Sequence, residues 1–147
     1  MAIEAGVRTI EHGTLLKDET LKLMAERDVS LTPTMAIQEL IYRYGKQIGI
    51  DHGGAWRRLR RLGRALPTWL GRRGSMGVTI IMGTDLGFKT NLDIDMGKNW
   101  VELQLMTELG GLSNIDALKA ATSNAARMLG INVGVNQGGK ACGHSVD

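Results

Sequence analysis

The chain has 147 residues, of which 43% are hydrophobic, so it is long enough for one globular domain with its own core. Its single cysteine, Cys142, excludes an intrachain disulfide and predicts a reducing, cytoplasmic compartment. No apolar run approaches the roughly 20 residues that cross a bilayer, so we expect no membrane contact.

Short β-branched runs alternate with helical patterns through the first half of the chain. Strands are expected at residues 7–10, 29–31 and 78–82, and helices at residues 15–27 and 34–44. Asp18 and Glu19 suit the positive N-terminal end of the first of these helices. The order of the elements predicts βα units around a parallel sheet, which is an α/β fold.

The positive net charge of +3 comes from one acid-free stretch, about residues 53–75. This stretch holds seven of the 18 basic residues, which leaves 11 basic against 15 acidic residues elsewhere; the seven are Arg57, Arg58, Arg60, Arg61, Arg64, Arg72 and Arg73. A confined basic segment is one mark of nucleic-acid contact, but no recognisable binding motif accompanies it, so nucleic acid is the least favoured partner. A shifted reading frame in GC-rich DNA and a genuine basic helix are both open interpretations.

The last third of the chain is expected to be helical. A helix at about residues 100–109 is followed by one that Ser113 and Asp116 open as a capping box and that runs to Ala121. Ser123 or Asn124 is expected to cap a final helix that ends at Gly130. We expect these helices to form a scaffold, and the eight methionines to fill gaps in the core.

Two side chains with metal-ligand chemistry directly follow predicted strands. His12 follows the first strand, and Asp85 follows the third after Gly83 and Thr84. Residues just past the C-terminal ends of parallel strands line the active face of such folds, and imidazole and carboxylate are ligands that zinc takes. Spacing alone also fits a hydrogen-bonded histidine at a strand end and an aspartate that caps a turn.

The motifs around these two residues resemble the amidohydrolase superfamily. Residues 2–7, leading into Ile10-Glu11-His12-Gly13-Thr14, are similar to its sixth-strand region, and residues 77–85 to its eighth strand. Residues 102–103 and 117–130 resemble the helices that follow, and the narrower likeness is to the branch of imidazolonepropionases and Xaa-Pro or Xaa-Arg dipeptidases. The resemblance implies the C-terminal part, about strands six to eight, of a TIM (β/α)8 barrel over residues 1–130.

The same resemblance implies hydrolysis of C–N bonds in small amides, cyclic amides or dipeptides by a metal-activated water. His12 would be a metal ligand, and Asp85 would be both a metal ligand and the catalytic residue that takes a proton from the water. The divalent metal of the full-length parent would be zinc, the usual choice of the family, although His and Asp also suit manganese or iron. For the fragment alone, binding of no metal is an open alternative. Glu102 and the loop at residues 84–99 are candidates for substrate contact, and a role as scaffold and surface fits them equally well.

The family also uses a His-x-His pair, commonly a lysine carbamate, and a further histidine, and none of these lies upstream of His12. We therefore expect a fragment that is inactive alone. The alternative is a non-catalytic fragment, either a truncated gene product or a half-barrel that needs a partner chain. Exposed sheet edges would also invite self-association.

The tail at residues 131–147 departs from the family pattern. Family members run Gly-Lys-Leu-Ala-Asp, whereas here Gly139 and Lys140 precede Ala-Cys-Gly-His-Ser-Val-Asp. Codons for this tail, displaced by one base, can encode Leu-Ala-Asp-Ile-Ala-Leu. We therefore predict a truncation or a frameshift after Lys140.

Overall fold

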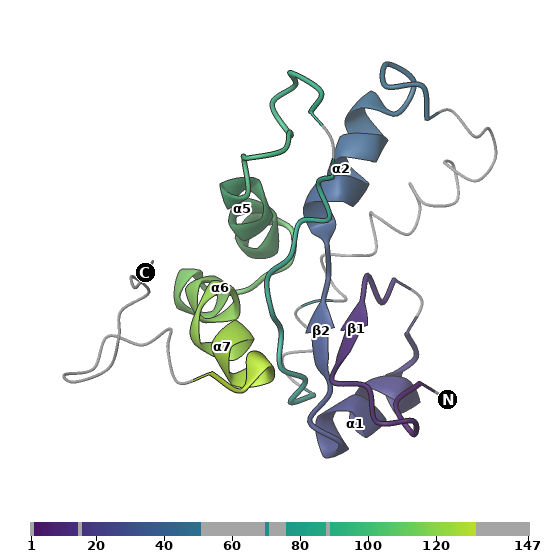
Figure 1. The fold of residues 1–147 in the computed structure, drawn as a ribbon, viewed down its shortest axis with the longest axis vertical. Coiled ribbons are helices and arrows are strands. Elements are labelled where there is room, and N and C mark those ends of the chain that lie inside the picture. Colours follow the sequence, from purple (N-terminus) through teal and green to yellow (C-terminus); the bar gives the residue numbers. More distant parts are fainter. Residues whose placement is uncertain (1, 15, 51–69, 71–75, 88, 132–147) are drawn as a thin grey trace.

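The computed structural model describes residues 2–14, 16–50, 70, 76–87 and 89–131 (Figure 1). The arginine-rich stretch, apart from Leu70, lies outside these residues, and so does the tail from residue 132. The predictions of nucleic-acid contact and of shifted reading frames fall on those segments and stay predictions. In the part that is described, no helix is long and apolar enough to span a bilayer.

The sheet is built on two short parallel strands. β1 (Thr9–Glu11) pairs in parallel with β2 (Ser30–Thr32), with Ile10 beside Leu31, and α1 (Asp18–Glu26) connects them. This arrangement confirms the predicted βα order in a parallel sheet. Each strand is one or two residues shifted from its predicted position.

The predicted third strand, 78–82, forms a single parallel bridge between Ile80 and Leu31 instead of a full strand. Leu31 donates its N–H to the carbonyl of Thr79 and accepts from the N–H of Ile81, each at 2.9 Å. The other edge of this segment is bonded to residues of helices instead of to a strand. The N–H of Met82 donates to the carbonyl of Ala120 at 2.9 Å, and the side chain of Asn124 donates to the carbonyl of Ile80 at 3.0 Å.

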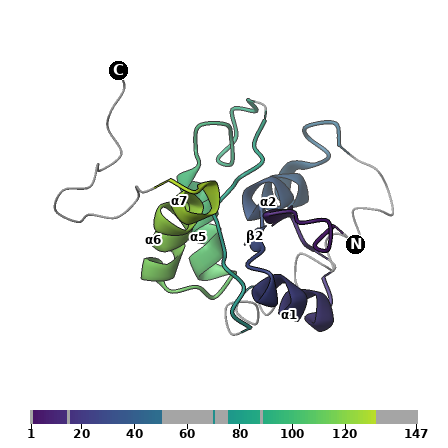
Figure 2. The ribbon, with the colours of Figure 1, turned by 60° about the horizontal axis from the view of Figure 1, so that its bottom comes forward.

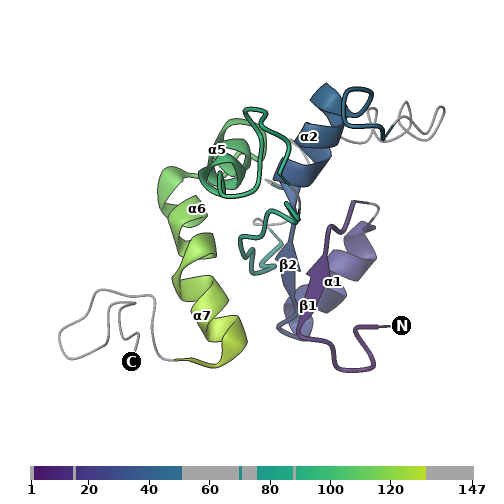
Figure 3. The same cartoon turned by 45° about the horizontal axis from the view of Figure 1, so that its top comes forward.

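Helices lie on both sides of this central segment. α2 is Met35–Tyr44, α5 is Trp100–Glu108, α6 is Asn114–Ala121 and α7 is Ser123–Leu129. Figures 1 and 2 show α5, α6 and α7 grouped on one side and α1, α2 and the β1–β2 pair on the other, with residues 76–87 between them. Figure 3 shows the same separation from another direction.

The core forms where these layers meet. Met24, Leu31, Leu40, Leu70 and Met106 are wholly buried. The burial of two methionines agrees with the predicted use of methionine to fill the core. The core contains residues from α1 and α2 and from α5 and α6, so the described elements share one apolar interior.

The caps of the last two helices differ in how well the sequence predicted them. The hydroxyl of Ser113 accepts the N–H of Asp116 at 3.1 Å, which confirms the predicted cap of α6. Gly130 ends α7 at a φ of 75°, as expected. The predicted cap by Ser123 or Asn124 is wrong, because Thr122 takes the N-cap position and the Asn124 amide is bonded to the sheet.

A buried carboxyl group joins α5 to the start of α2. Glu102 is fully buried; its Oε1 accepts the N–H of Met35 at 2.8 Å and its Oε2 that of Ala36 at 2.6 Å. The first N–H groups of a helix have no partner within the helix, so Glu102 satisfies two of them. Burial raises the pKa of Glu102 to about 7, against the opposing effect of these two hydrogen bonds.

We expect this carboxyl group to make the free energy of unfolding fall as the pH rises. The folded-state pKa of Glu102 lies above the ordinary 4.5, so its contribution is complete below about pH 4.5 and is lost as the pH rises through about 7. The shift corresponds to about 3 kcal/mol between the two limits. Urea denaturation of the wild type and of Glu102→Gln from pH 4.5 to 8.5 measures it.

Glu108→Gln is the matched control, because Glu108 is an exposed glutamate on the same helix. The control should keep the wild-type pH dependence, while Glu102→Gln should flatten it. A Glu102→Gln profile parallel to that of the wild type would show that this carboxyl group does not titrate as described.

Candidate functional site

Three parallel segments of chain end at the same edge of the sheet. β1 is followed at once by His12, β2 by Pro33 and Thr34, and the bridged segment by residues 83–85. In parallel α/β folds the residues past the C-terminal ends of the strands build the functional face. His12, Thr34 and Asp85 therefore share the position that such folds use for chemistry.

The backbone at these three positions is strained. His12, Thr34 and Asp85 have φ angles of 62°, 50° and 55°, and they are three of the five non-glycine residues with positive φ in the described chain. Positive φ is uncommon outside glycine, above all for a β-branched residue such as threonine. Strained residues of this kind gather at functional sites, where surrounding structure holds them in place.

His12 is held through its backbone and one ring nitrogen. Its N–H donates to the carbonyl of Thr32 at 2.8 Å, and its Nδ1 lies 2.6 Å from Oγ1 of Thr34. The residue is exposed, and within the described chain its Nε2 makes no hydrogen bond. His12 is thus a hydrogen-bonded histidine at a strand end that still has one nitrogen available.

Asp85 lies on a turn that its neighbours fix. The N–H of Leu86 donates to Oγ1 of Thr84 at 3.3 Å, and the carbonyl of Thr84 accepts the N–H of Ile37 in the first turn of α2, also at 3.3 Å. Asp85 is exposed, and no residue in the described ranges bonds to its carboxylate. The structure therefore gives no support to the alternative in which Asp85 caps a turn.

Gly83 allows this turn to lie close to β2. A Cβ atom on Gly83 would come within 2.6 Å of Cγ2 of Thr32, which is closer than carbon atoms approach. The chain therefore passes β2 at a distance that only glycine permits. This contact positions the turn that carries Asp85.

The described residues do not assemble a complete metal site. Among them no three His, Cys, Asp or Glu side chains lie close enough together to hold an ion. Glu102, a sequence-based candidate for substrate contact, has both carboxylate oxygens on the N-terminus of α2 and is fully buried. Its burial and bonding give it a structural role.

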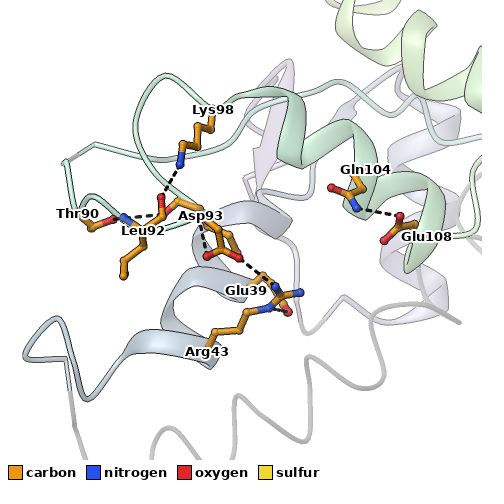
Figure 4. A network of polar contacts seen from close by, with 9 residues as sticks. Glu39, Arg43, Thr90, Leu92, Asp93, Lys98, Gln104 and Glu108 are labelled. Atoms are coloured by element: carbon orange, nitrogen blue, oxygen red, sulfur yellow. Dashed lines mark hydrogen bonds and ion pairs between the residues drawn. The ribbon is translucent and has the colours of Figure 1, made fainter.

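Polar contacts hold the loop after Asp85 against the C-terminal end of α2 (Figure 4). Arg43 in α2 pairs with Glu39 and, at 3.5 Å, with Asp93 in the loop. Nζ of Lys98 donates to the carbonyl of Leu92 at 2.7 Å, which closes the loop on itself. These contacts connect the described part of the loop to α2.

Asp95 organises the interior of this loop. Its carboxylate accepts the N–H groups of Thr90, Asn91 and Met96 at 2.7, 2.8 and 2.8 Å. These bonds, led by the one from Thr90, lower the pKa of the Asp95 carboxyl group. Asp95 therefore acts as a loop-forming carboxylate and is not available for substrate.

A small cavity of about 50 Å³ lies at the opposite end of the sheet. Its lining includes Arg8, which precedes β1, Ser30 at the start of β2, and Thr79. These residues mark the N-terminal ends of the parallel segments. The cavity is therefore separate from the edge that carries His12 and Asp85.

Thr34 is the residue that sequence reasoning missed at this edge. It follows β2 as His12 follows β1 and Asp85 follows the bridged segment. Examination of the first residues after every predicted strand, regardless of their metal-binding chemistry, would have included it. Its hydroxyl contact with His12 depends on a distance that the sequence does not encode.

Comparison with known proteins places the chain in a family. The model of the amidohydrolase family matches residues 1–142. Ochratoxinase of Aspergillus niger is 30% identical over 130 residues, which cover 88% of this chain and 25% of that protein. Its crystal structure superposes with a TM-score of 0.68 at 29% identity, covering 86% of this chain and 26% of the other.

Two other solved structures are similar. An Xaa-Pro dipeptidase with bound methionine has a TM-score of 0.72 at 30% identity, over 88% of this chain and 30% of the dipeptidase. A prolidase complexed with N-methylphosphonate-L-proline has a TM-score of 0.75 at 25% identity, over 94% of this chain and 32% of the prolidase.

The chain belongs to the amidohydrolase family. It spans about a quarter of the length of the curated relatives that it matches. The family resemblance inferred from the strand-end motifs is therefore confirmed, together with the likeness to dipeptidases.

The close approach at Gly83 yields a test of how this edge is built. We expect Gly83→Ala to lower the free energy of unfolding by about 1–3 kcal/mol, because the added methyl group meets Thr32. Gly87→Ala is the matched control, since a Cβ there has no neighbour within 4 Å. Urea denaturation of the variants at one pH measures the difference.

The double variant Gly83→Ala, Thr32→Ser removes Cγ2 and should recover part of the lost stability. Equal stabilities for Gly83→Ala and Gly87→Ala would mean that the turn does not depend on the contact with Thr32.

Proposed function

We propose that this chain is part of a metal-dependent amidohydrolase that hydrolyses C–N bonds in small amides, cyclic amides or dipeptides. The observation that carries the proposal is the placement of His12 and Asp85 just past the C-terminal ends of the two parallel segments that flank β2, each at positive φ. Family membership supplies the reaction class. The dipeptidase and prolidase among the similar structures favour dipeptides, including those with proline.

In this proposal the three parallel segments are strands six to eight of a (β/α)8 barrel. Support comes from the parallel order of β1, β2 and the bridged segment, and from relatives in which this chain matches 25–33% of the length. The remaining ligands and pocket loops would come from the rest of that barrel. The chain alone is then expected to be inactive.

The residues present fit part of a divalent metal site. The Nε2 of His12 and the carboxylate of Asp85 are exposed and make no hydrogen bond within the described chain, and both are donor types that zinc accepts. We propose that the ion is zinc. Manganese and iron are alternatives, because they also accept histidine and aspartate as ligands. A bound divalent ion would polarise the scissile carbonyl and activate water for attack.

His12 and Asp85 would have different roles. His12, fixed through Thr32 and Thr34, would help to hold the ion. The carboxylate of Asp85 would be a second ligand and would also accept the proton of the attacking water, which is general-base catalysis. The described part of the loop between residues 86 and 99 would border the substrate.

Metal titration tests the ligand assignment directly. We expect the chain to bind Zn²⁺ weakly, and His12→Ala and Asp85→Asn each to reduce the affinity by about tenfold or more, because each removes a ligand. Competition with a chromophoric zinc indicator measures the affinity.

Asp28→Asn is the matched control, because Asp28 is also exposed and has a φ of 52°, but lies before β2 at the other end of the sheet. It should bind Zn²⁺ as the wild type does. Wild-type affinity in both His12→Ala and Asp85→Asn would refute the assignment.

Activity is tested on a longer polypeptide. Extension of the coding sequence upstream should supply an in-frame His-x-His and further ligands, and the extended protein should hydrolyse Xaa-Pro dipeptides or other small amides. Asp85→Asn in that protein should reduce kcat by at least about 100-fold, because it removes the general base. Amine release in a coupled assay measures turnover, and undiminished activity in Asp85→Asn would exclude the proposed role.

A further inference from the structure

Thr34 occupies the N-cap position of α2 but does not act as a cap. A threonine at this position usually accepts an N–H of the first helical turn with its hydroxyl oxygen. The side chain of Thr34 makes no such bond. It is nearly fully buried, so its hydroxyl group must have its partners within the protein.

Other groups cap α2 in its place. Glu102 accepts the N–H groups of Met35 and Ala36, and the carbonyl of Thr84 accepts that of Ile37. These are the first three residues of the helix. The hydroxyl of Thr34 is thereby released from capping and contacts Pro33 and His12 instead.

The two contacts of this hydroxyl determine which ring nitrogen of His12 carries the proton. Oγ1 of Thr34 lies 2.8 Å from the carbonyl oxygen of Pro33, and two oxygens at that distance repel unless a hydrogen lies between them. A carbonyl only accepts, so the single hydroxyl hydrogen is donated to Pro33. The 2.6 Å contact with His12 must then be a bond that Nδ1–H donates to Oγ1.

A neutral imidazole with its proton on Nδ1 has its lone pair on Nε2. The Nε2 atom of His12 is the one without a hydrogen bond in the described chain, on an exposed residue. We propose that Thr34 is a positioning residue that holds His12 as the Nδ1–H tautomer and so presents Nε2 as the metal-binding atom. The metal-binding part rests on the proposed function, whereas the tautomer does not.

The backbone of Thr34 supports a role for its side chain. With φ and ψ both at 50°, a β-branched residue is strained by about 1–3 kcal/mol, whereas glycine adopts this conformation freely. The contacts of the buried threonine side chain must offset that strain. The hydroxyl contacts with Pro33 and His12 are those that the structure shows.

Nitrogen NMR of the metal-free chain tests the tautomer. Two-bond ¹H–¹⁵N correlation of the imidazoles, at a pH where they are neutral, should show His12 with Nδ1 protonated and Nε2 bare. Comparison with His12→Ala identifies the signal. A wild-type signal with Nε2 protonated would overturn the proposal without any variant.

Two matched variants separate the hydroxyl from the rest of the side chain. Thr34→Val removes the hydroxyl at nearly constant shape and should shift His12 toward the Nε2–H tautomer, while Thr34→Ser retains the hydroxyl and should keep the wild-type signal. An unchanged tautomer in a folded Thr34→Val would overturn the proposal. Circular dichroism establishes that each variant is folded.

Zinc affinity is the second readout. Thr34→Val should weaken Zn²⁺ binding by about 10–100-fold, as is usual when the partner of a ligating histidine is removed, and Thr34→Ser should restore most of it. Unchanged affinity despite a shifted tautomer would overturn the metal-positioning role. If the wild type shows the expected tautomer and binds no Zn²⁺, the expectation that this chain binds the ion fails and the metal-positioning role fails with it, while the tautomer assignment stands.

Discussion

The sheet edge that carries His12, Thr34 and Asp85 depends on the contact between the carboxyl group of Glu102 and the first turn of α2. An acid at a helix N-terminus is favoured by the helix dipole, but this one is also fully buried, at the cost of desolvation. Without it, two buried amide groups at Met35 and Ala36 would lose their partners. The contact ties α5, from late in the chain, to the residue that immediately follows Thr34.

The position of His12 follows from this anchoring by a short series of contacts. Capping by Glu102 and Thr84 fixes the start of α2, and Thr34 directly precedes that start. The side chain of Thr34 then contacts the ring of His12. The orientation of an exposed histidine thus depends on a buried carboxyl group on another helix, in addition to the backbone bond of His12 to Thr32.

Local signals in the sequence predicted the elements well and the tertiary contacts poorly. The acidic first turn and apolar spacing of α1 and the serine cap of α6 are encoded within a few residues, and the structure confirms them. Asn124 was expected to cap α7, yet its amide reaches Ile80, 44 residues away. No local pattern distinguishes these two uses of an asparagine.

In the candidate site, too, the sequence indicates local features and does not indicate the tertiary contacts. His12 and Asp85 are candidates from the sequence because their chemistry, their places after β-branched runs and the family resemblance are visible there, whereas Thr34 has an ordinary side chain whose contact with His12 depends on one distance. For Glu102 the sequence leaves substrate contact and a scaffold role both open, because the burial of an acidic residue on an apolar helix cannot be inferred from its neighbours in the chain. The strand at 78–82 was overestimated because its outer edge is bonded to helices.

The bonds along the outer edge of residues 78–82 limit where a further strand can join the sheet. The carbonyl of Ile80 and the N–H of Met82 are already bonded to Asn124 and Ala120, whereas β1 has only β2 as a strand partner in the described chain. In the described chain the edge of β1 is thus the one that a further strand can join without displacing the bonds to Asn124 and Ala120. Closure of the proposed barrel on the other side would require a strand to replace those two bonds.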